Sequence, residues 1–324
     1  MIIKPKRDLL GLRNLSAEEI HSVIHSAETM KYVLSKPLKR APHLLGKSVV
    51  ELFLSESIRT KLSFELAAKY MSGTLSAVAV PPDSKREKIL DVAAAVDRMG
   101  ADIIIVRANR AGVADLVAKH VSANVINGGD GFNEQPTQAL VDIFTIYQNK
   151  GKIEGLKVAI VGDIIHSGVA RSNIWGLTRL GAQVCVGAPA TLIPPGLSRM
   201  GVHVFNTPQE AMLDADVVMS VSLRKDCAGR MYPDTREYAR FFAIDEQRMQ
   251  YAKPDALVMH ALPVRRGVEL MSGVINLKNS VLDEQVTNGV AVKMAVLFLY
   301  ARKSGLYGTE LMETLKKEKG GLLL

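Results

Sequence analysis

Short apolar runs rich in β-branched residues alternate with segments of helical spacing along almost the whole chain. The run Ser-Val-Val-Glu-Leu-Phe at residues 48–53 is typical, and a segment of helical spacing follows it closely. Strands of a parallel sheet are covered by helices on both faces, so they form near-continuous apolar runs of this kind. The alternation therefore predicts an α/β protein built on doubly wound parallel sheets.

The first half of the chain contains the clearest alternation of strands and helices. A capping box at residues 16–19 predicts a helix that runs to about residue 34. The elements expected after it are strands at residues 48–53, 74–80, 102–107 and 124–126 and helices at residues 61–71, 89–99, 113–121 and 137–147. The glycine-rich segment at residues 127–133 predicts a turn-rich loop after the fourth strand.

The length of 324 residues predicts two domains, each a doubly wound parallel sheet, joined by interdomain helices. Residues 151–155 form the expected joint, so the first domain is predicted at residues 1–150 and the second at residues 151–282. A tail is expected at residues 304–324. Further strands are expected at residues 156–163, 183–186, 202–205, 217–221 and 256–259.

A long, mostly apolar helix is expected at residues 283–303. We expect it to pack back on the first domain and to tie the two domains together. One face of this helix is predicted to consist of Val286, Val290, Met294 and Leu297.

Charge and composition bound the function. The net charge is +8, but the basic residues are scattered instead of forming a stripe with aromatic residues between them, so we expect no nucleic-acid binding. Excess positive charge suits small anionic substrates. No run reaches the ~20 apolar residues that span a membrane, and the N-terminus lacks a signal-peptide core. Cys185 and Cys227 form no disulfide framework or metal site, so we expect a cytoplasmic protein without metal or cofactor.

The turn after the first strand is the first candidate binding site. Ser57, Arg59 and Thr60 stand where a strand passes into a helix. Free backbone N–H groups and the positive end of the helix dipole meet there, and hydroxyls and a guanidinium add donors, which favours a phosphate. A capped helix start with a solvated arginine is the alternative. Arg107, at the carboxyl end of the third strand, is a further candidate because ligands of open α/β sheets bind at those ends.

Residues 57–65, Ser-Ile-Arg-Thr-Lys-Leu-Ser-Phe-Glu, resemble the carbamoyl-phosphate turn of the aspartate and ornithine carbamoyltransferases. The family sequence is usually Ser-Thr-Arg-Thr-(Arg)-x-Ser-Phe-Glu, so Ile58 replaces a threonine and removes one hydroxyl. The resemblance implies that Ser57, Arg59, Thr60 and Arg107 bind carbamoyl phosphate. The family counterpart of Arg107 is followed by His-Pro, where this chain has Ala108 and Asn109.

Residues 135–140, Gln-Pro-Thr-Gln-Ala-Leu, are similar to the family signature His-Pro-Thr-Gln-Ala-Leu. The family histidine donates a hydrogen bond to the carbonyl oxygen, and the family glutamine contacts the carbamoyl amide. Gln138 keeps the second role by resemblance, whereas Gln135 replaces the histidine. A glutamine amide still donates to an oxygen, but it cannot be charged or tuned by pH.

Residues 84–91 resemble the family loop Lys-Gly-Glu-Ser-Leu-x-Asp-Thr, which reaches into the site of a neighbouring subunit. Lys85 matches the family lysine that touches both ligands, so the resemblance implies a catalytic and acceptor-binding role for Lys85 in a homotrimer. The flexible glycine has become Arg86, which narrows the accessible backbone, and Lys88 replaces a small polar residue.

Residues 162–173 resemble the aspartate branch of the family almost residue by residue. The exception is Gly168, which replaces an arginine that binds the α-carboxylate of the acceptor. Arg224 matches the start of the family sequence Leu-Arg-x-Gln and would face the side-chain carboxylate of aspartate, but Asp226 falls near the glutamine and would repel it. Residues 260–263 resemble the His-Pro-(Leu/Gly)-Pro turn, whose backbone carbonyls, here of Leu262 and Pro263, accept from the carbamoyl NH2.

The resemblance implies transfer of a carbamoyl group from carbamoyl phosphate to the amino group of L-aspartate, in pyrimidine biosynthesis, or to another amine. The catalytic residues by resemblance are Arg59, Lys85, Arg107 and Gln135. The departures leave open an inactive paralogue that serves as structural or regulatory partner of an active enzyme, and association with another pyrimidine-pathway protein is expected. A dinucleotide-binding oxidoreductase is disfavoured because no Gly-x-Gly-x-x-Gly follows residues 161–163.

Overall fold

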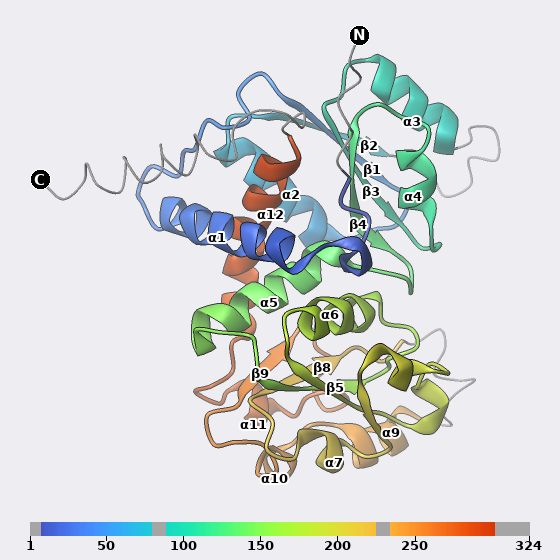
Figure 1. The fold of residues 1–324 in the computed structure, drawn as a ribbon, viewed down its shortest axis with the longest axis vertical. Helices are drawn as coiled ribbons and strands as arrows, with labels where there is room; N and C mark the ends of the chain where they lie inside the picture. Colours follow the sequence, from blue (N-terminus) through green and yellow to red (C-terminus); the bar gives the residue numbers. More distant parts are fainter. Residues whose placement is uncertain (1–7, 80–88, 225–233, 302–324) are drawn as a thin grey trace, which may run out of the picture.

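The computed structural model describes residues 8–79, 89–224 and 234–301, and it contains two parallel sheets (Figure 1). The first sheet has the order β2-β1-β3-β4, and the second has the order β7-β6-β5-β8-β9. All pairings between these strands are parallel, which confirms the predicted doubly wound α/β fold. The strands are β1 (Ser48–Phe53), β2 (Thr74–Ala79), β3 (Ile103–Ala108), β4 (Asn124–Asp130), β5 (Lys157–Gly162), β6 (Gln183–Gly187), β7 (His203–Phe205), β8 (Val217–Val221) and β9 (Leu257–His260).

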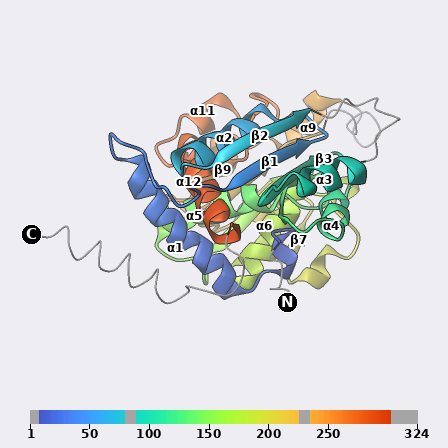
Figure 2. The same ribbon diagram turned by 90° about the horizontal axis from the view of Figure 1, so that it is seen from above.

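Helices cover the two sheets and fill the space between them (Figures 1 and 2). The α-helices are α1 (Ala17–Leu34), α2 (Ile58–Tyr70), α3 (Ile89–Arg98), α4 (Val113–Ala118), α5 (Pro136–Lys150), α6 (Gly168–Arg179), α7 (Pro208–Met212), α9 (Thr235–Phe242), α10 (Glu246–Met249), α11 (Ser272–Ile275) and α12 (Leu282–Tyr300). Figure 1 shows α5 at the junction of the two parts, beside α6. No helix in the described ranges is long and apolar enough to cross a membrane.

Local sequence signals set the starts of the helices that matter for the site. The predicted capping box begins α1, because the Ser16 hydroxyl accepts from the Glu19 backbone and the Glu19 carboxylate accepts from the Ser16 backbone. Ser57 caps α2, and Pro136 occupies the first turn of α5, where its missing N–H costs no hydrogen bond. Gly151 ends α5 in the left-handed conformation that favours glycine.

The glycine-rich segment at residues 127–133 is not wholly a loop, which corrects the prediction. Strand β4 continues through Asp130: Asn127 pairs with Val106 and Asp130 with Ala108, with a register shift between these two pairs. A Cβ on Gly129 would lie 2.6 Å from Nη1 of Arg107, and Nη1 donates to the Gly128 carbonyl at 2.6 Å. The two glycines therefore mark a close approach of the arginine to the strand. In the sequence alone, such a pair of glycines resembles a turn.

The packed face of the long helix α12 differs from the prediction. Val286, expected on the packed face, is 51% exposed, while polar residues elsewhere on the helix, including Asn288 and Lys293, are buried. The reason is that α12 lies between α1, α2 and α5, so nearly its whole circumference after the first turn is covered. Figure 2 shows α12 enclosed by these helices.

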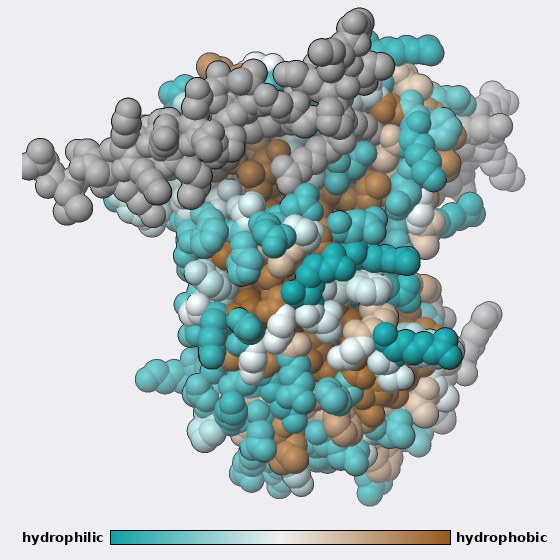
Figure 3. Space-filling view, viewed as in Figure 1, coloured by the Kyte–Doolittle hydropathy of each residue, from teal (hydrophilic) through white to brown (hydrophobic). Residues whose placement is uncertain are grey.

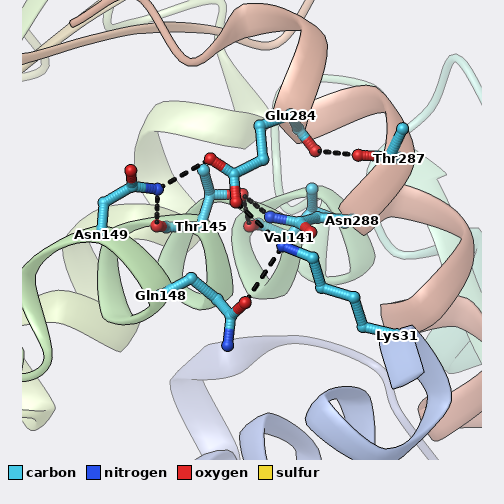
Figure 4. A network of polar contacts seen from close by, with 8 residues as sticks. All are labelled: Lys31, Val141, Thr145, Gln148, Asn149, Glu284, Thr287 and Asn288. Atoms are coloured by element: carbon cyan, nitrogen blue, oxygen red, sulfur yellow. Dashed lines mark hydrogen bonds and ion pairs between the residues drawn. The ribbon is translucent and has the colours of Figure 1, made fainter. Parts of the chain in front are cut away.

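Polar contacts fix α12 against α1 and α5 (Figure 4). Glu284 accepts from Lys31 at 2.9 Å and from Asn149 at 2.9 Å, so one carboxylate joins three helices. One turn farther along, Asn288 donates to the Thr145 hydroxyl at 2.9 Å in the buried interface. Because unpaired polar groups are costly when buried, these bonds specify one register between the helices.

One hydrophobic core runs from the first sheet through α1, α5 and α12 into the second sheet. Val49 and Ile105 belong to it on one side, and Ile160 and Met219 belong to it on the other. Figure 3 shows hydrophilic residues over much of the viewed face, with hydrophobic residues visible between them around the middle of the molecule. The continuous core makes the two sheets one packed body.

Glu51 is an unexpected carboxyl group inside this body. It lies on β1 between its pairing partners Ala77 and Ile105, is 1% exposed, and accepts no hydrogen bond from the described residues. Burial raises the pKa of Glu51 to about 7, while nearby Lys61 lowers it and Glu65 raises it. In the folded protein Glu51 is therefore mainly protonated below about pH 7 and mainly ionised above it.

We expect Glu51→Gln to stabilise the fold at alkaline pH. A folded-state pKa above the unfolded value gives stability that is complete below about pH 4.5 and lost as the pH rises through about 7. The variant should therefore gain about 2 kcal/mol in unfolding free energy over the wild type between about pH 5 and pH 8. Urea unfolding across this range measures the difference. Glu237→Gln, at an exposed position on α9, is the matched control, because Glu237 is not among the charges that shift the pKa of Glu51. An equal pH dependence in both variants would contradict the assignment.

Candidate functional site

The predicted phosphate turn lies at the carboxyl end of β1. The Ser57 hydroxyl accepts from the Thr60 backbone at 3.4 Å and donates to the Thr60 hydroxyl at 2.8 Å, so the turn is held from within. The Leu54 backbone donates to the Arg107 carbonyl at 2.8 Å, which joins this end of β1 to the end of β3. The turn thus presents the first N–H groups of α2 beside Arg107, as a phosphate site requires.

Arg107 is fixed at the bottom of this site. Its Nη1 donates to the Gly128 carbonyl, while its buried Nε has no partner among the described residues. Burial lowers the pKa of Arg107, and the positive charges of Arg224 and Arg59 lower it further. Burial also lowers the pKa of Arg59. Cations that approach each other in this way, with a buried donor unused, favour an anion between them.

Gln135 and Gln138 stand at the start of α5, next to this cluster. The Cγ of Gln135 lies 3.5 Å from where a Cβ on Gly129 would be, which is the same point that Arg107 approaches. The backbone N–H of Gln135 donates to the Ser172 hydroxyl on α6 at 2.9 Å. Gln138 donates from Nε2 to Asp142 at 2.9 Å. The structure therefore brings Gln135 beside Arg107 at the edge of the first sheet, while the Gln138 side chain is bonded to Asp142.

Arg224 reaches the cluster from the second sheet. Its guanidinium carbon lies 5.0 Å from the ring centroid of Phe132, and the His166 ring contacts Phe132 edge-on at 5.0 Å. The buried Asp163, at the end of β5, accepts from the Arg224 backbone at 3.3 Å and from His166 Nδ1 at 2.9 Å. Phe132 was not singled out from the sequence, since an aromatic ring in a glycine-rich segment has no distinctive spacing. It forms the wall between the two sheets at this point.

A second buried carboxylate orders the other side of the site. Glu269 accepts from the Leu223 backbone at 2.9 Å, the Arg265 backbone at 2.9 Å and His260 Nε2 at 3.1 Å. It thereby joins the segment that leads to Arg224 with the turn that carries Leu262 and Pro263. The peptide bond between Leu262 and Pro263 is cis. The predicted carbonyl acceptors and the predicted acceptor-binding arginine therefore share one support.

Gly168, at the first position of α6, lies against the loop that precedes α5. A Cβ there would be 3.2 Å from the Gly131 carbonyl oxygen and 3.2 Å from the Glu134 carbonyl carbon. Glu134 is itself held by the Leu12 backbone at 2.7 Å and by the Ser172 hydroxyl at 2.8 Å. The absence of a side chain at Gly168 thus accompanies a tight contact between the two sheets.

The remaining predicted residues have different outcomes. Lys85, Arg86, Lys88 and Asp226 lie outside the described residues. Ile58 is 82% exposed at the start of α2, whereas Ala108 is buried. Arg171 lines a cavity of about 250 Å³ with Arg13, Trp175 and Pro194, and none of the predicted ligand residues lines it. Arg171 therefore does not take the place that an arginine at position 168 would occupy. Within the described ranges, no three His, Cys, Asp or Glu side chains are placed to hold a metal.

Lys293 is a functional candidate that sequence reasoning missed. It is 5% exposed on α12, and its Nζ lies 5.5 Å from the ring centroid of Phe64 on α2. Burial lowers the pKa of Lys293 to about 8, Asp142 raises it, and the charges of Arg59 and Arg107 lower it. The coupling to both arginines places a titrating cation behind the phosphate turn. In the sequence it is one lysine in an apolar helix and gives no signal of this position.

Two family models match the chain. The carbamoyl-phosphate-binding domain of aspartate/ornithine carbamoyltransferases matches residues 7–148, and the aspartate/ornithine-binding domain matches residues 154–300. An aspartate carbamoyltransferase catalytic subunit of Acetivibrio thermocellus is 54% identical over 306 residues, covering 94% of this chain and 98% of the relative. That of Ruminiclostridium cellulolyticum is 53% identical over 300 residues, covering 92% and 96%.

Solved structures agree with these matches. Ornithine carbamoyltransferase from Pyrococcus furiosus is similar with a TM-score of 0.81 and 30% identity, covering 93% of this chain and 98% of that one. Aspartate transcarbamoylase from Trypanosoma cruzi in complex with carbamoyl aspartate and phosphate is similar with a TM-score of 0.80 and 26% identity, covering 92% and 99%.

We expect Lys293→Met to remove a pH dependence of phosphate binding. Protonated Lys293 adds positive charge beside Arg59 and Arg107, and an anion there favours the charged form, so affinity should fall as the pH rises through about 8. Inorganic phosphate binding, measured by calorimetry, should weaken by roughly threefold to tenfold between about pH 8 and pH 9.5 in the wild type and much less in the variant. Lys31→Met, at a half-buried lysine on α1, is the control. An unchanged profile in Lys293→Met would contradict the coupling.

Proposed function

The chain belongs to the aspartate/ornithine carbamoyltransferase family, and from that premise we propose how it acts as a carbamoyltransferase of the aspartate type. The reaction transfers the carbamoyl group of carbamoyl phosphate to the amino group of L-aspartate. The observation that carries the proposal is the convergence of Arg59 and Arg107 with Arg224, which comes from the other sheet. Gln135 and Gln138 stand beside this charge cluster at the start of α5. Such a site suits a substrate with a phosphate at one end and a carboxylate at the other.

In this proposal, residues at the edge of the first sheet bind carbamoyl phosphate. Ser57, Arg59 and Thr60 bind the phosphate with the N-terminus of α2, and Arg107 binds it from the end of β3. Gln135 donates its amide hydrogen to the carbonyl oxygen, where negative charge develops as the amine attacks. Removing the family histidine leaves a neutral donor, so the polarisation of the carbonyl becomes independent of pH.

The chemical step needs no nucleophilic side chain. The amine nitrogen attacks the carbonyl carbon, the bond from that carbon to the phosphate oxygen breaks, and inorganic phosphate leaves with a proton from the amine. The protein contributes alignment of the amine and stabilisation of the developing charge. The carbonyl oxygens of Leu262 and Pro263 accept from the carbamoyl NH2 and hold its plane.

On the acceptor side, Arg224 binds the side-chain carboxylate of aspartate, and its guanidinium packs over Phe132.

We propose a homotrimer in the cytoplasm in which Lys85 of the neighbouring subunit touches both ligands. The domain boundaries at residues 1–150, 151–282 and 304–324, with the helix at residues 283–303 packed on the first domain, are part of the same proposal. Association with another protein of the pyrimidine pathway is likewise proposed.

An inactive paralogue is the alternative that the departures at residues 58, 135 and 168 left open. The comparisons give this alternative no support, since the relatives reported above are aspartate carbamoyltransferase catalytic subunits by name. Other amines remain candidate acceptors because Gly168 lacks a side chain that could bind an α-carboxylate.

We expect the wild type to form N-carbamoyl-L-aspartate and phosphate in equal amounts from carbamoyl phosphate and saturating L-aspartate. A colorimetric ureido assay with a panel of other amines measures the choice of acceptor. Arg107→Met should lower kcat/KM for carbamoyl phosphate by about tenfold to hundredfold, because a charge-assisted contact is lost. Arg98→Met, at an exposed position on α3, should have no effect. Absence of product with any amine from folded protein would contradict the proposed function.

We expect Gly168→Arg to raise transfer to L-aspartate by lowering its KM by roughly tenfold, since a guanidinium adds a contact to the α-carboxylate. The new Cβ requires the loop around Gly131 and Glu134 to move by a few tenths of an ångström. Gly168→Gln adds the same Cβ without the charge and is the matched control. No rise in Gly168→Arg would contradict L-aspartate as the native acceptor.

A further inference from the structure

Asp142 is a buried carboxylate at the meeting point of three helices. It lies on α5, is 1% exposed, and accepts three side-chain hydrogen bonds. Its Oδ1 accepts from Gln138 Nε2 at 2.9 Å and from Gln285 Nε2 at 2.8 Å, and its Oδ2 accepts from Asn173 Nδ2 at 2.8 Å. The donors come from α5, α12 and α6, so helices from both parts of the molecule donate to this one side chain.

Burial raises the pKa of Asp142, whereas its three amide donors and His260 lower it. In its ionised form Asp142 accepts hydrogen bonds and donates none, so it decides which way each amide points. For two of the amides a second contact requires the same orientation. Gln285 Oε1 accepts from the His260 backbone at 3.1 Å, and Asn173 Nδ2 also donates to the Val169 carbonyl at 3.1 Å. These contacts support the assignment of Asp142 as the common acceptor.

Gln138 has no second contact of this kind among the described residues. Because its NH2 group is turned to Asp142, its Oε1 is left available as an acceptor. The carbamoyl group carries an NH2 donor where an acetyl group carries a methyl group. An acceptor at Gln138 therefore distinguishes the two, whereas a flipped amide would place NH2 against NH2.

The same carboxylate supports the opposite wall of the site. Through Gln285 it holds the backbone of His260, from which the chain turns to Leu262 and Pro263. Their carbonyl oxygens are the other proposed acceptors for the carbamoyl NH2. Asp142 thus sets two acceptor groups from two sheets without lying in the binding site.

We propose that Asp142 is the positioning residue that makes the site specific for the NH2 group of the carbamoyl donor. This inference rests on the proposed function, because it assigns Gln138 to the carbamoyl group. It predicts that altering Asp142 changes the relative affinity of the site for an amide and for a methyl ketone of the same shape. A merely structural role of Asp142 would leave this relative affinity unchanged.

Asp142→Asn is the variant that tests the orientation. At the Oδ1 position its NH2 group would face Gln138 and Gln285, and at the Oδ2 position it would face Asn173. Gln138 alone lacks a second anchor within the described residues, so its amide is the one released from a fixed orientation. The probes are phosphonoacetamide and acetonylphosphonate, two stable phosphonates that differ in NH2 against CH3. We expect the wild type to bind the amide at least about tenfold more tightly, and the variant to lose most of this ratio.

Two further variants separate positioning from stability. Gln285→Leu leaves Asp142 paired with Gln138 but releases the His260 backbone, so the ratio should fall by a few-fold in a folded protein. Thr145→Val removes a buried hydrogen bond from Asn288 one turn along the same interface, which Figure 4 shows. This control should lower the unfolding midpoint and leave the ratio unchanged.

Calorimetric titration of each phosphonate measures the ratio without acceptor and without turnover. If the wild type prefers the amide and Asp142→Asn loses that preference, but the wild type transfers no carbamoyl group, the proposed function is contradicted and the positioning role of Asp142 stands. A wild type that transfers the carbamoyl group while folded Asp142→Asn and Gln285→Leu keep the full ratio would overturn this inference alone. If Gln285→Leu folds and Asp142→Asn does not, the ratio of the two phosphonate affinities in Gln285→Leu alone supports or overturns the inference. A wild type that binds the two phosphonates equally, or neither, also overturns the inference.

Discussion

A polar group buried between two sheets must find its hydrogen-bond partners there, and this requirement shapes the whole site. Asp142 takes amide donors from three helices, Glu269 takes donors from three segments of the second sheet, and Glu134 joins the N-terminal segment to α6. Each carboxylate would be costly if one partner moved away, because the remaining charge would stay buried. The sheets are therefore held in one relative position by groups that lie behind the binding residues.

Close backbone approach is the second constraint, and it explains the glycines of the site. Gly129 has a φ of 125° and lies under the Arg107 guanidinium, where any side chain would collide with Nη1. The arginine can then reach the Gly128 carbonyl and keep its other donors for a ligand. Gly168 allows a similar approach between α6 and the loop before α5. A glycine that replaces a ligand-binding side chain thus also sets how closely the two sheets meet.

Most of the fold could be predicted from the sequence, because short apolar strands and capped helices are encoded locally. The strands at residues 48–53 and 217–221 occur as expected, and the capping box at residues 16–19 begins α1. The errors occurred where tertiary contacts override local pattern. Strand β4 runs through its glycines because Arg107 packs over them, and α12 is buried on nearly all sides because other helices surround it. The site residues were predicted from motifs, but Asp142 and Lys293 act from behind them and have no motif to reveal them.

The departures from the family pattern occur on both sides of the site, at residues 58, 108 and 135 on the phosphate side and at residue 168 on the acceptor side. The arginines retained on the two sides differ in burial. On the phosphate side, Arg107 and Gln138 are bonded to buried groups, so a substitution there disturbs the core as well as the ligand. On the acceptor side, Arg224 is exposed and is steadied by Phe132 and by its own backbone contact. A change at Arg224 therefore leaves the core intact. Gly168, in contrast, is buried against the loop before α5, so a side chain there changes how closely the two parts of the molecule meet as well as how the acceptor is bound.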